Sequence, residues 1–272
     1  MTPAIVDVLI ASCNRPLALS ITLTALSAQT LRPMRIIISD QSDSRVFDQP
    51  EVAAVLRYLA HQQHQIDACH HLPRRGMAEQ RAFLLSRARA RCCLFLDDDV
   101  IMEPDLVERL LDWLRREQCG FVGSALHGLS FLDDHRPHQQ SIEFWQGRVH
   151  PETVMPNAAA WHRHHLHSAA NLLHVQHRLS TTKEKSRLYK VAWVGGCVMF
   201  DTEKLRDCGG FDFWNQLPAE HCGEDVLAQL RVMARHGGCA LIPSGAYHLE
   251  LPTTLPARDV DAPLALKTWL PQ

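Results

Sequence analysis

The sequence predicts an α/β protein with a mostly parallel sheet that carries helices on both faces. Two observations lead to this prediction. Short apolar segments of strand length alternate four times with segments of helical periodicity in the first 117 residues. Polar residues also collect where three of the strands end, at 12–15, 40–44 and 97–99. Parallel strands end at one edge of a sheet, so we expect these three loops to open together where such folds bind ligands.

The first strand is expected over residues 4–11, which are almost wholly apolar. A helix should follow up to Gln29, because Asn14 is a suitable N-cap and Pro16 suits a first helical turn. Its apolar stripe is predicted from the spacing of Leu17, Ile21 and Leu26. Further strands are predicted at 34–39, 66–72 and 92–96, and further helices at 51–60, 76–91 and from Pro104 to 117.

The alternation stops at residue 127. Ten of the 17 histidines lie between His127 and His177. We interpret 127–190 as a His-rich insertion of loops and short helices over the site. Its densest run, 161–167, has no carboxylate or cysteine nearby at ligand spacing, so surface or substrate-facing polar roles are favoured over a metal site.

Regular structure is expected to resume with a strand over 191–200 that two glycines interrupt. Glycines inside a strand indicate either a bulge or the close approach of a ligand, and a simple bend is equally compatible. A helix ending at Gly237 should start with Glu224 and Asp225. Two short strands are expected over 239–251, and the tail 252–272 is either a lid or disordered.

Composition excludes several classes of protein. The 28 basic and 30 acidic residues give a net charge of −2, so no basic field favours nucleic acid as a partner. No apolar run approaches the roughly 18–20 residues of a transmembrane helix. The nine cysteines are odd in number and form no C-x-x-C pair, which is typical of reduced thiols. We expect a cytoplasmic protein, either free or peripheral at the inner face of the membrane.

Three consecutive carboxylates, Asp97, Asp98 and Asp99, follow the apolar run at 92–96. Adjacent carboxylates repel one another, and a cation relieves that repulsion. Oxygen ligands select Mg²⁺ or Mn²⁺, which keep positions free for phosphate oxygens, so a metal site for a diphosphate is one interpretation. A solvated acidic turn before the next helix is the alternative. Neither G-x-G-x-x-G nor a P-loop is present.

The order of six segments resembles glycosyltransferase family 2, whose members have the GT-A fold. The segments are VLIASCNRP, IIISDQSDS, FLDDDV, VGGCVMF, GGFDF and GEDVLAQLR. The resemblance covers 1–126 and 191–250. It implies a Rossmann-like sheet in one catalytic domain, with the following parts: a nucleotide-sugar half at 1–126, the insertion 127–190, an acceptor and catalytic half at 191–251, and the tail 252–272.

The resemblance implies a metal-dependent, inverting transfer of a sugar from a nucleotide-diphosphate donor, with a UDP-sugar favoured. The acceptor hydroxyl would belong to a glycan, a lipid-linked molecule or a small molecule, in cell-surface glycan or glycoconjugate synthesis. Mn²⁺ or Mg²⁺ is the implied cofactor. Because no Q-x-x-R-W follows Asp225, the chain does not resemble a processive synthase, and we expect a non-processive hexosyl- or related transferase.

Site residues are carried over from the same resemblance. Asp225 is the implied catalytic base, and Glu224 would hold the acceptor or orient the loop. The implied metal ligands are Asp97, Asp99 and His248. The implied donor-binding residues are Ala11, Ser12, Asn14 and Arg15 against the uridine, Asp40 at the base, Arg81 on the nucleotide, and Asp97 and Asp98. Trp193, Gly195 and Gly196 are expected to contact the sugar or the acceptor.

Two other classes are compatible with the residues. A sugar-phosphate nucleotidyltransferase also uses an acidic metal site on an α/β sheet, but it normally has a glycine-rich loop after the first strand, and 12–16 contains no glycine. A non-enzymatic metal-binding module built on the His-rich segment is the other alternative.

Overall fold

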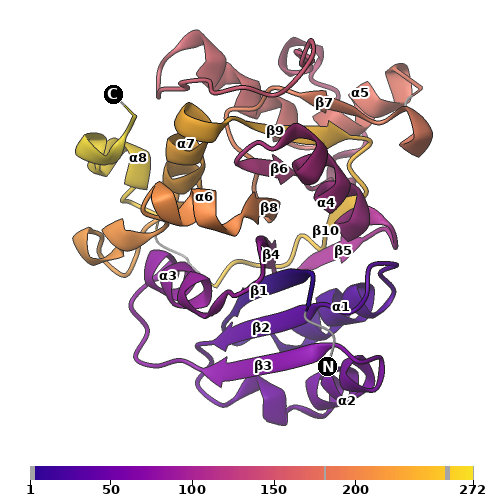
Figure 1. The fold of residues 1–272 in the computed structure, drawn as a ribbon, viewed down its shortest axis with the longest axis vertical. Coiled ribbons are helices and arrows are strands. Elements are labelled where there is room, and N and C mark those ends of the chain that lie inside the picture. Colours follow the sequence, from indigo (N-terminus) through magenta and orange to yellow (C-terminus); the bar gives the residue numbers. More distant parts are fainter. Residues whose placement is uncertain (1–3, 181, 255–257, 272) are drawn as a thin grey trace.

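A computed structural model describes residues 4–180, 182–254 and 258–271. Its main feature is an eight-stranded sheet with the strand order β3-β2-β1-β4-β8-β6-β9-β7 (Figure 1). The strands are β1 (Val6–Ser12), β2 (Arg35–Asp40), β3 (Gln65–His70), β4 (Cys92–Asp97), β6 (Phe121–Gly123), β7 (Arg187–Tyr189), β8 (Cys197–Asp201) and β9 (Gly238–Ile242). Strand β8 runs antiparallel to β4 and β6, and β7 runs antiparallel to β9; the other pairs are parallel. The predicted α/β class with a mostly parallel sheet is confirmed.

Helices cover both faces of this sheet. The helices are α1 (Pro16–Ser27), α2 (Pro50–His61), α3 (Met77–Arg87), α4 (Leu106–Glu117), α5 (Asn171–Arg178), α6 (Thr202–Asp207), α7 (Glu224–His236) and α8 (Ala262–Ala265). Short 3₁₀ turns occur at Val46–Asp48, Leu129–Phe131, Pro137–Gln139, Ala159–His167, Lys183–Lys185, Asp212–Gln216 and Lys267–Trp269. In Figure 1, α1 and α4 lie to one side of the sheet, and α3, α6 and α7 lie to the other. None of the helices in the described part of the chain is both long and apolar enough to cross a bilayer.

The core consists of two clusters, one on each face of the sheet. Side chains of a strand alternate between faces, so Val8 and Ile10 of β1 pack toward α1 and α4, whereas Leu9 packs toward α3 and α7. Every residue of β2 is buried. The near-continuous apolar runs in the sequence therefore reflect strands that are covered on both sides.

Three local predictions are wrong. Leu17 and Ile21 are 67% and 41% exposed, because α1 faces the sheet through Ala18, Leu19 and Leu23 instead. Asn14 is not the N-cap of α1. It adopts a left-handed backbone conformation, and its side-chain amide hydrogen-bonds Asp43. Helix α3 ends at Arg87 rather than at residue 91.

The predicted strand over 191–200 is also shorter than expected. Strand β8 begins at Cys197, so the two glycines precede the strand rather than interrupt it. Gly196 has a φ of +75°, which ends the extended course of the chain before β8 starts. The two short strands expected over 239–251 are present as β9 and β10 (Ala246–His248), and β10 pairs with β5 (Val100–Met102) in a separate small sheet.

Residues 127–190 are integrated with the sheet. Their last part forms β7 at the sheet edge, and Val154, Leu166 and Val175 belong to the core cluster on the α3 and α7 face. The description of this segment as a His-rich insertion is therefore not confirmed. The tail contains α8, whose Ala262 is fully buried, so the alternative of a disordered tail is wrong for 258–271. Residues 255–257 lie outside the described part.

Candidate active site

Strands β1, β2 and β4 end at the same edge of the sheet. Ser12 pairs with Asp40, and Ala11 pairs with Asp97, in the parallel registers of these strands. The first helical residue of α7 reaches the same edge, because Glu224 contacts Arg81 of α3. The predicted meeting of the three polar loops is confirmed.

The acidic turn after β4 is buried and paired. Arg15 donates from Nη1 to Asp98 Oδ1 at 2.9 Å and from Nη2 to Asp99 Oδ2 at 2.5 Å. The Ser12 hydroxyl donates to Asp98 Oδ2 at 2.7 Å. Burial raises the pKa of Asp98 to about 7, although Arg15 and Ser12 favour its charged form. Both Asp98 and Asp99 are only 4% exposed, so the alternative of a solvated turn is wrong.

His248 approaches this turn from the small sheet. It lies opposite Val100 in the β5–β10 pair, and the Leu249 amide donates to the Asp99 carbonyl at 2.9 Å. His248 Nε2 is consequently 3.4 Å from Asp99 Oδ2. Residues that are 149 positions apart in the sequence thus bring an imidazole and a carboxylate together.

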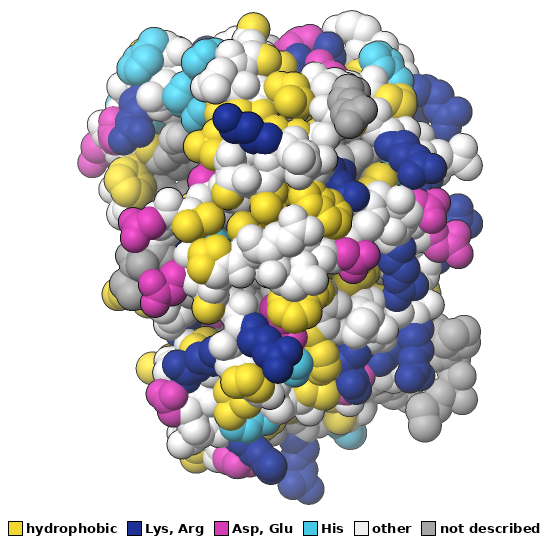
Figure 2. All heavy atoms as spheres, turned by 90° about the vertical axis from the view of Figure 1, so that its left-hand side faces the viewer, with side chains coloured by type: hydrophobic (Ala, Val, Ile, Leu, Met, Phe, Trp, Pro, Cys, Tyr) yellow, Lys and Arg dark blue, Asp and Glu magenta, His cyan; other side chains and the backbone are white. Residues whose placement is uncertain are grey.

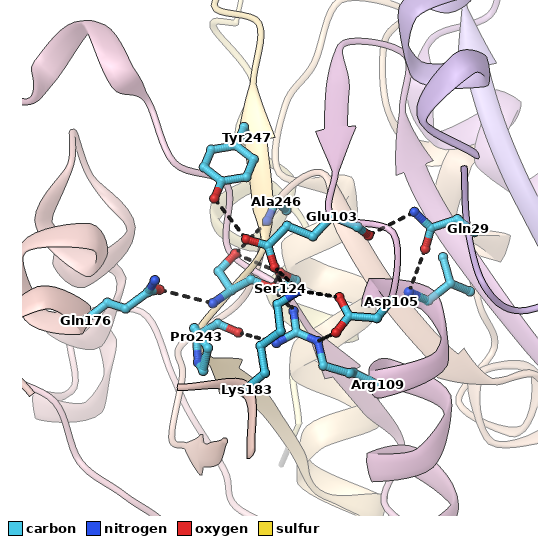
Figure 3. A network of polar contacts seen from close by, with 12 residues as sticks. Gln29, Glu103, Asp105, Arg109, Ser124, Gln176, Lys183, Pro243, Ala246 and Tyr247 are labelled. Carbon is cyan, nitrogen blue, oxygen red and sulfur yellow. Dashed lines mark hydrogen bonds and ion pairs between the residues drawn. The ribbon is translucent and has the colours of Figure 1, made fainter. Parts of the chain in front are cut away.

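A polar network fixes the strand that contains His248 (Figure 3). The Tyr247 hydroxyl donates to Glu103 Oε1 at 3.1 Å, and Lys183 Nζ lies 3.0 Å from Glu103 Oε2 and 2.9 Å from Asp105 Oδ1. The Arg109 guanidinium of α4 donates to the Pro243 and Ser244 carbonyls, just before β10. These contacts connect β10 to β5, to α4 and to the 3₁₀ turn at Lys183–Lys185.

Arg81 joins the acidic turn to the start of α7. Its Nε donates to Glu224 Oε1 at 2.9 Å, and its Nη2 donates to Asp97 Oδ1 at 3.3 Å. Burial opposes the charge of the guanidinium, but Glu224 and Asp97 outweigh it and raise the pKa of Arg81. Burial and the charge of Glu224 raise the pKa of Asp225 to about 7, while Arg81 opposes this rise. The carboxyl group of Asp225 can therefore gain or lose a proton near neutral pH.

The segment before β8 forms another wall of this region. Gln229 of α7 accepts a hydrogen bond from the Val194 amide and donates one to the Val194 carbonyl, both at 2.8 Å. The Asp97 amide donates to the Gly196 carbonyl at 2.9 Å. Trp193 stacks on His164 with ring centroids 4.8 Å apart. The predicted acceptor residues thus lie between α7 and the acidic turn; their contact with a sugar stays a prediction.

The two glycines give a matched test of this geometry. A Cβ at Gly196 would lie 2.4 Å from Leu126 Cδ1 in a backbone conformation unfavourable for L-residues, whereas nothing lies within 4 Å of a Cβ at Gly195. We expect Gly196→Ala to lower the free energy of unfolding by about 1–3 kcal/mol and to reduce activity. Gly195→Ala is the control and should unfold like the wild type in urea. Equal stability of both variants would contradict the assigned backbone.

A cavity of about 240 Å³ lies beside the first-strand loop and the start of α3. Of the predicted donor residues, it contains Ala11, Ser12, Arg15 and Asp98 in its lining, together with Arg74 and Gln80 among others. Figure 2 views the molecule from the side where the parallel strands end, and basic side chains gather over its lower, N-terminal half. The lining holds two arginines, Arg15 and Arg74, beside two carboxyls, Asp98 and Glu220, and the guanidinium groups can pair with an anionic ligand.

Four predicted donor residues lie outside that lining: Arg81 and Asp97, whose contacts are given above, and Asp40 and Asn14. Asp40 is fully buried, and its carboxylate accepts the amides of Ser42 and Val46 at 2.9 and 2.8 Å, so it orders the loop that follows β2. The Asn14 side chain exchanges hydrogen bonds with Asp43. Their contact with a nucleotide stays a prediction.

Several residues of the site had no sequence signal of their own. Gln80 donates to the Ser39 carbonyl at 2.6 Å and so joins α3 to the end of β2. His221 Nε2 accepts the Ala78 amide at 3.0 Å and thereby satisfies a free N–H at the start of α3. The position of Gln80 next to Arg81 was the one hint available, since both lie on the helix that faces the site.

The predicted metal ligands have the oxygen and nitrogen atoms that a divalent ion binds. Within the described residues, no three His, Cys, Asp or Glu side chains converge as a metal-holding group. Asp99 and His248 nevertheless place an oxygen and a nitrogen 3.4 Å apart. Mg²⁺ and Mn²⁺ bind proteins through as few as one or two side chains and complete their coordination with water and substrate phosphates. The residues present therefore fit such an ion.

Comparisons with known proteins agree with this geometry. A family model described as glycosyl transferase family 2 matches residues 7–177. A search of curated proteins finds no match. Among solved structures, S. aureus TarS 1-349 in complex with UDP-GlcNAc is 12% identical with a TM-score of 0.58, over 92% of this chain and 60% of that one.

A second similar structure is the mannosyltransferase PcManGT from Pyrobaculum calidifontis in complex with GDP-Man and Mn²⁺. It is 16% identical with a TM-score of 0.51, over 88% of this chain and 57% of that one. At such low identity the similarity shows the fold alone, and this chain spans between 36% and 62% of the similar structures. The family model, however, matches more than half of the sequence. The chain therefore belongs to glycosyltransferase family 2, and it has the GT-A fold.

Proposed function

We propose that the protein is a metal-dependent, inverting glycosyltransferase that moves a sugar from a nucleotide diphosphate, with a UDP-sugar favoured, to an acceptor hydroxyl. The observation that carries this proposal is the Arg81 bridge, which joins Glu224 next to Asp225 with Asp97 of the acidic turn. A carboxylate able to accept a proton is thereby held beside the donor residues. The family match favours this function over a nucleotidyltransferase or a metal-binding module.

The donor would occupy the cavity between the first-strand loop and α3. Arg15 and Arg74 line it and can pair with phosphate oxygens, while Ser12 and Asp98 fix Arg15 in place. TarS with UDP-GlcNAc and PcManGT with GDP-Man support a sugar nucleotide as the donor class. When bound, Mn²⁺ or Mg²⁺ would be held by Asp99 and His248 with Asp97 nearby, and would neutralise charge on the departing diphosphate.

Asp225 would act on the acceptor side. A carboxylate whose pKa lies near 7 can take the proton of a hydroxyl while oxygen attacks the sugar. Arg81 and Glu224 keep this end of α7 next to the acidic turn, and the acceptor is proposed to attack from the side opposite the leaving diphosphate. This geometry would invert the anomeric centre. Trp193, Gly195 and Gly196 would form the wall that receives the acceptor.

The acceptor is proposed as a glycan, a lipid-linked molecule or a small molecule in cell-surface glycan or glycoconjugate synthesis. Transfer would be non-processive and would take place in the cytoplasm or at the inner face of the membrane. This location rests on the nine cysteines, all of which are free thiols.

A panel of sugar nucleotides tests the donor assignment. We expect one of them to raise the thermal unfolding midpoint by several degrees in the presence of Mn²⁺, because a ligand that binds only the folded state stabilises it. The measurement is a thermal scan with UDP-GlcNAc, UDP-glucose, UDP-galactose and GDP-mannose, each with Mn²⁺ and with EDTA. Stabilisation by GDP-mannose alone would contradict UDP, and no stabilisation by any donor would contradict the proposal.

The acid limb of the pH profile should report Asp225. Its pKa is raised to about 7, and the group must be deprotonated to accept a proton. Transfer should therefore increase as pH rises from about 5.5 to 8, about tenfold per pH unit below the pKa. Initial rates at subsaturating acceptor would show this rise. A rate that stays flat between pH 5.5 and 8 would contradict the assignment, provided that donor stabilisation is unchanged over that range.

A further inference from the structure

A second cavity lies away from the donor site. Its volume is about 540 Å³, and it lies between α4, the loop after Trp145 and the start of β7. Trp145 and Leu188 in its lining pack with α1 and α4, on the opposite face of the sheet from α3 and α7. None of its lining residues lines the donor cavity. A ligand in this second cavity would therefore not compete with a sugar nucleotide.

Positive charge dominates this cavity. Its lining contains three arginines, Arg116, Arg148 and Arg187, and a single carboxylate, Glu117. That carboxylate accepts the Val149 amide at 2.9 Å and lies 3.9 Å from Arg116 Nε. It can balance only one guanidinium, so two positive charges in the lining have no acidic partner within the cavity.

The guanidinium groups are held in place. Arg116 lies over the Trp113 ring at 4.9 Å, and Arg187 lies over the Phe144 ring at 3.4 Å. Arg148 Nη2 donates to the Arg116 carbonyl at 3.0 Å. Guanidinium groups held in this way lose little further freedom when they bind a carboxylate, and their planar fork matches its two oxygens.

Aromatic surface accompanies the charge. Both Trp113 and Trp145 line the cavity, and Trp113 Nε1 donates to the Ser186 hydroxyl at 3.2 Å, which fixes the tilt of its ring. The apolar face of a sugar ring packs on such a surface, while its acidic group pairs with arginine. We propose that this cavity binds an acidic oligosaccharide, with carboxylate-bearing sugar rings, at a site separate from sugar transfer. It would hold an acidic glycan chain on the protein during a transfer event.

Binding of trigalacturonate to the full chain tests this proposal. We expect saturable binding by titration calorimetry at low salt, and an affinity that falls as ionic strength rises. The double variant Arg148→Gln and Arg187→Gln should bind at least tenfold more weakly. Arg115→Gln is the matched control, since this exposed arginine lies on the same helix outside the cavity, and it should bind like the wild type. Maltotriose, a neutral saccharide, should bind at least tenfold more weakly than trigalacturonate.

The proposal would be overturned if trigalacturonate did not bind the wild type saturably, or if maltotriose bound as tightly as trigalacturonate. It would also be overturned if Arg115→Gln lost as much affinity as the double variant. Competition by citrate as strong as that by trigalacturonate would show that charge alone is recognised, and would overturn it too. Stabilisation by the sugar nucleotide should be unchanged in the double variant, and this reports that it is folded. If the double variant unfolds, Arg187→Gln alone serves, because it removes only the contact with Phe144. Failure of this proposal leaves the donor panel unaffected, so the two proposals are judged separately.

Discussion

Asp225→Asn should abolish sugar transfer while donor binding stays nearly intact. The asparagine keeps the size of the side chain but cannot accept the proton of an acceptor hydroxyl. Loss of a general base typically slows a reaction about 10²- to 10⁴-fold. Arg81 would still pair with Glu224 and Asp97, so the donor side of the site should keep its shape. The measurements are the initial rate of transfer and the Kd of the sugar nucleotide with Mn²⁺.

Asp112→Asn is the matched control, because it makes the same chemical change at an exposed carboxyl on α4, far from α7 in sequence. It should transfer sugar at the wild-type rate. A wild-type rate in Asp225→Asn would show that the base assignment is wrong. If Asp225→Asn lost both donor affinity and transfer, Asp225 would hold the site together rather than accept a proton.

Much of the first half of the fold could be predicted because three of its strands, β1, β2 and β4, are largely apolar runs of six or seven residues. The expected strand at 34–39 is β2 at Arg35–Asp40, one residue later, and every residue in it is buried. Strands of three residues, such as β6 and β7, are too short to show any periodicity. The antiparallel course of β8 could not be predicted either, since it depends on how the chain returns from 127–190 and not on the residues of the strand.

The candidate site divides in the same way. The acidic turn and the Glu-Asp pair of α7 are contiguous in the sequence, so a motif could locate them. Their partners are not contiguous: Arg15 and Asp98 are 83 residues apart, and Arg81 and Glu224 are 143 residues apart. Packing of the sheet, rather than any local pattern, decides these pairs. The function of the arginines as partners of carboxylates became visible only in three dimensions.

Asp99→Ala should weaken metal-dependent nucleotide binding at least tenfold, or about 1.4 kcal/mol. The Asp99 carboxylate lies between Arg15 at 2.5 Å and His248 at 3.4 Å, so its removal would leave His248 without the oxygen beside it. Of the two proposed metal ligands positioned by the β5–β10 pair, Asp99 and His248, only His248 would remain. Because few protein ligands hold Mg²⁺ or Mn²⁺ in such sites, the loss of one should have a large effect.

Calorimetric titration of UDP with Mn²⁺ and with EDTA separates the effect on the metal from general damage. In the wild type, Mn²⁺ should increase the affinity for UDP; in Asp99→Ala, the two titrations should approach one another. Asp48→Ala is the control, since this exposed carboxyl belongs to the same half of the chain. An unchanged affinity of Asp99→Ala with Mn²⁺ would remove the acidic turn from metal binding. Arg15 would then be the group that balances the charge of the acidic turn, and arginine side chains alone would recognise the diphosphate.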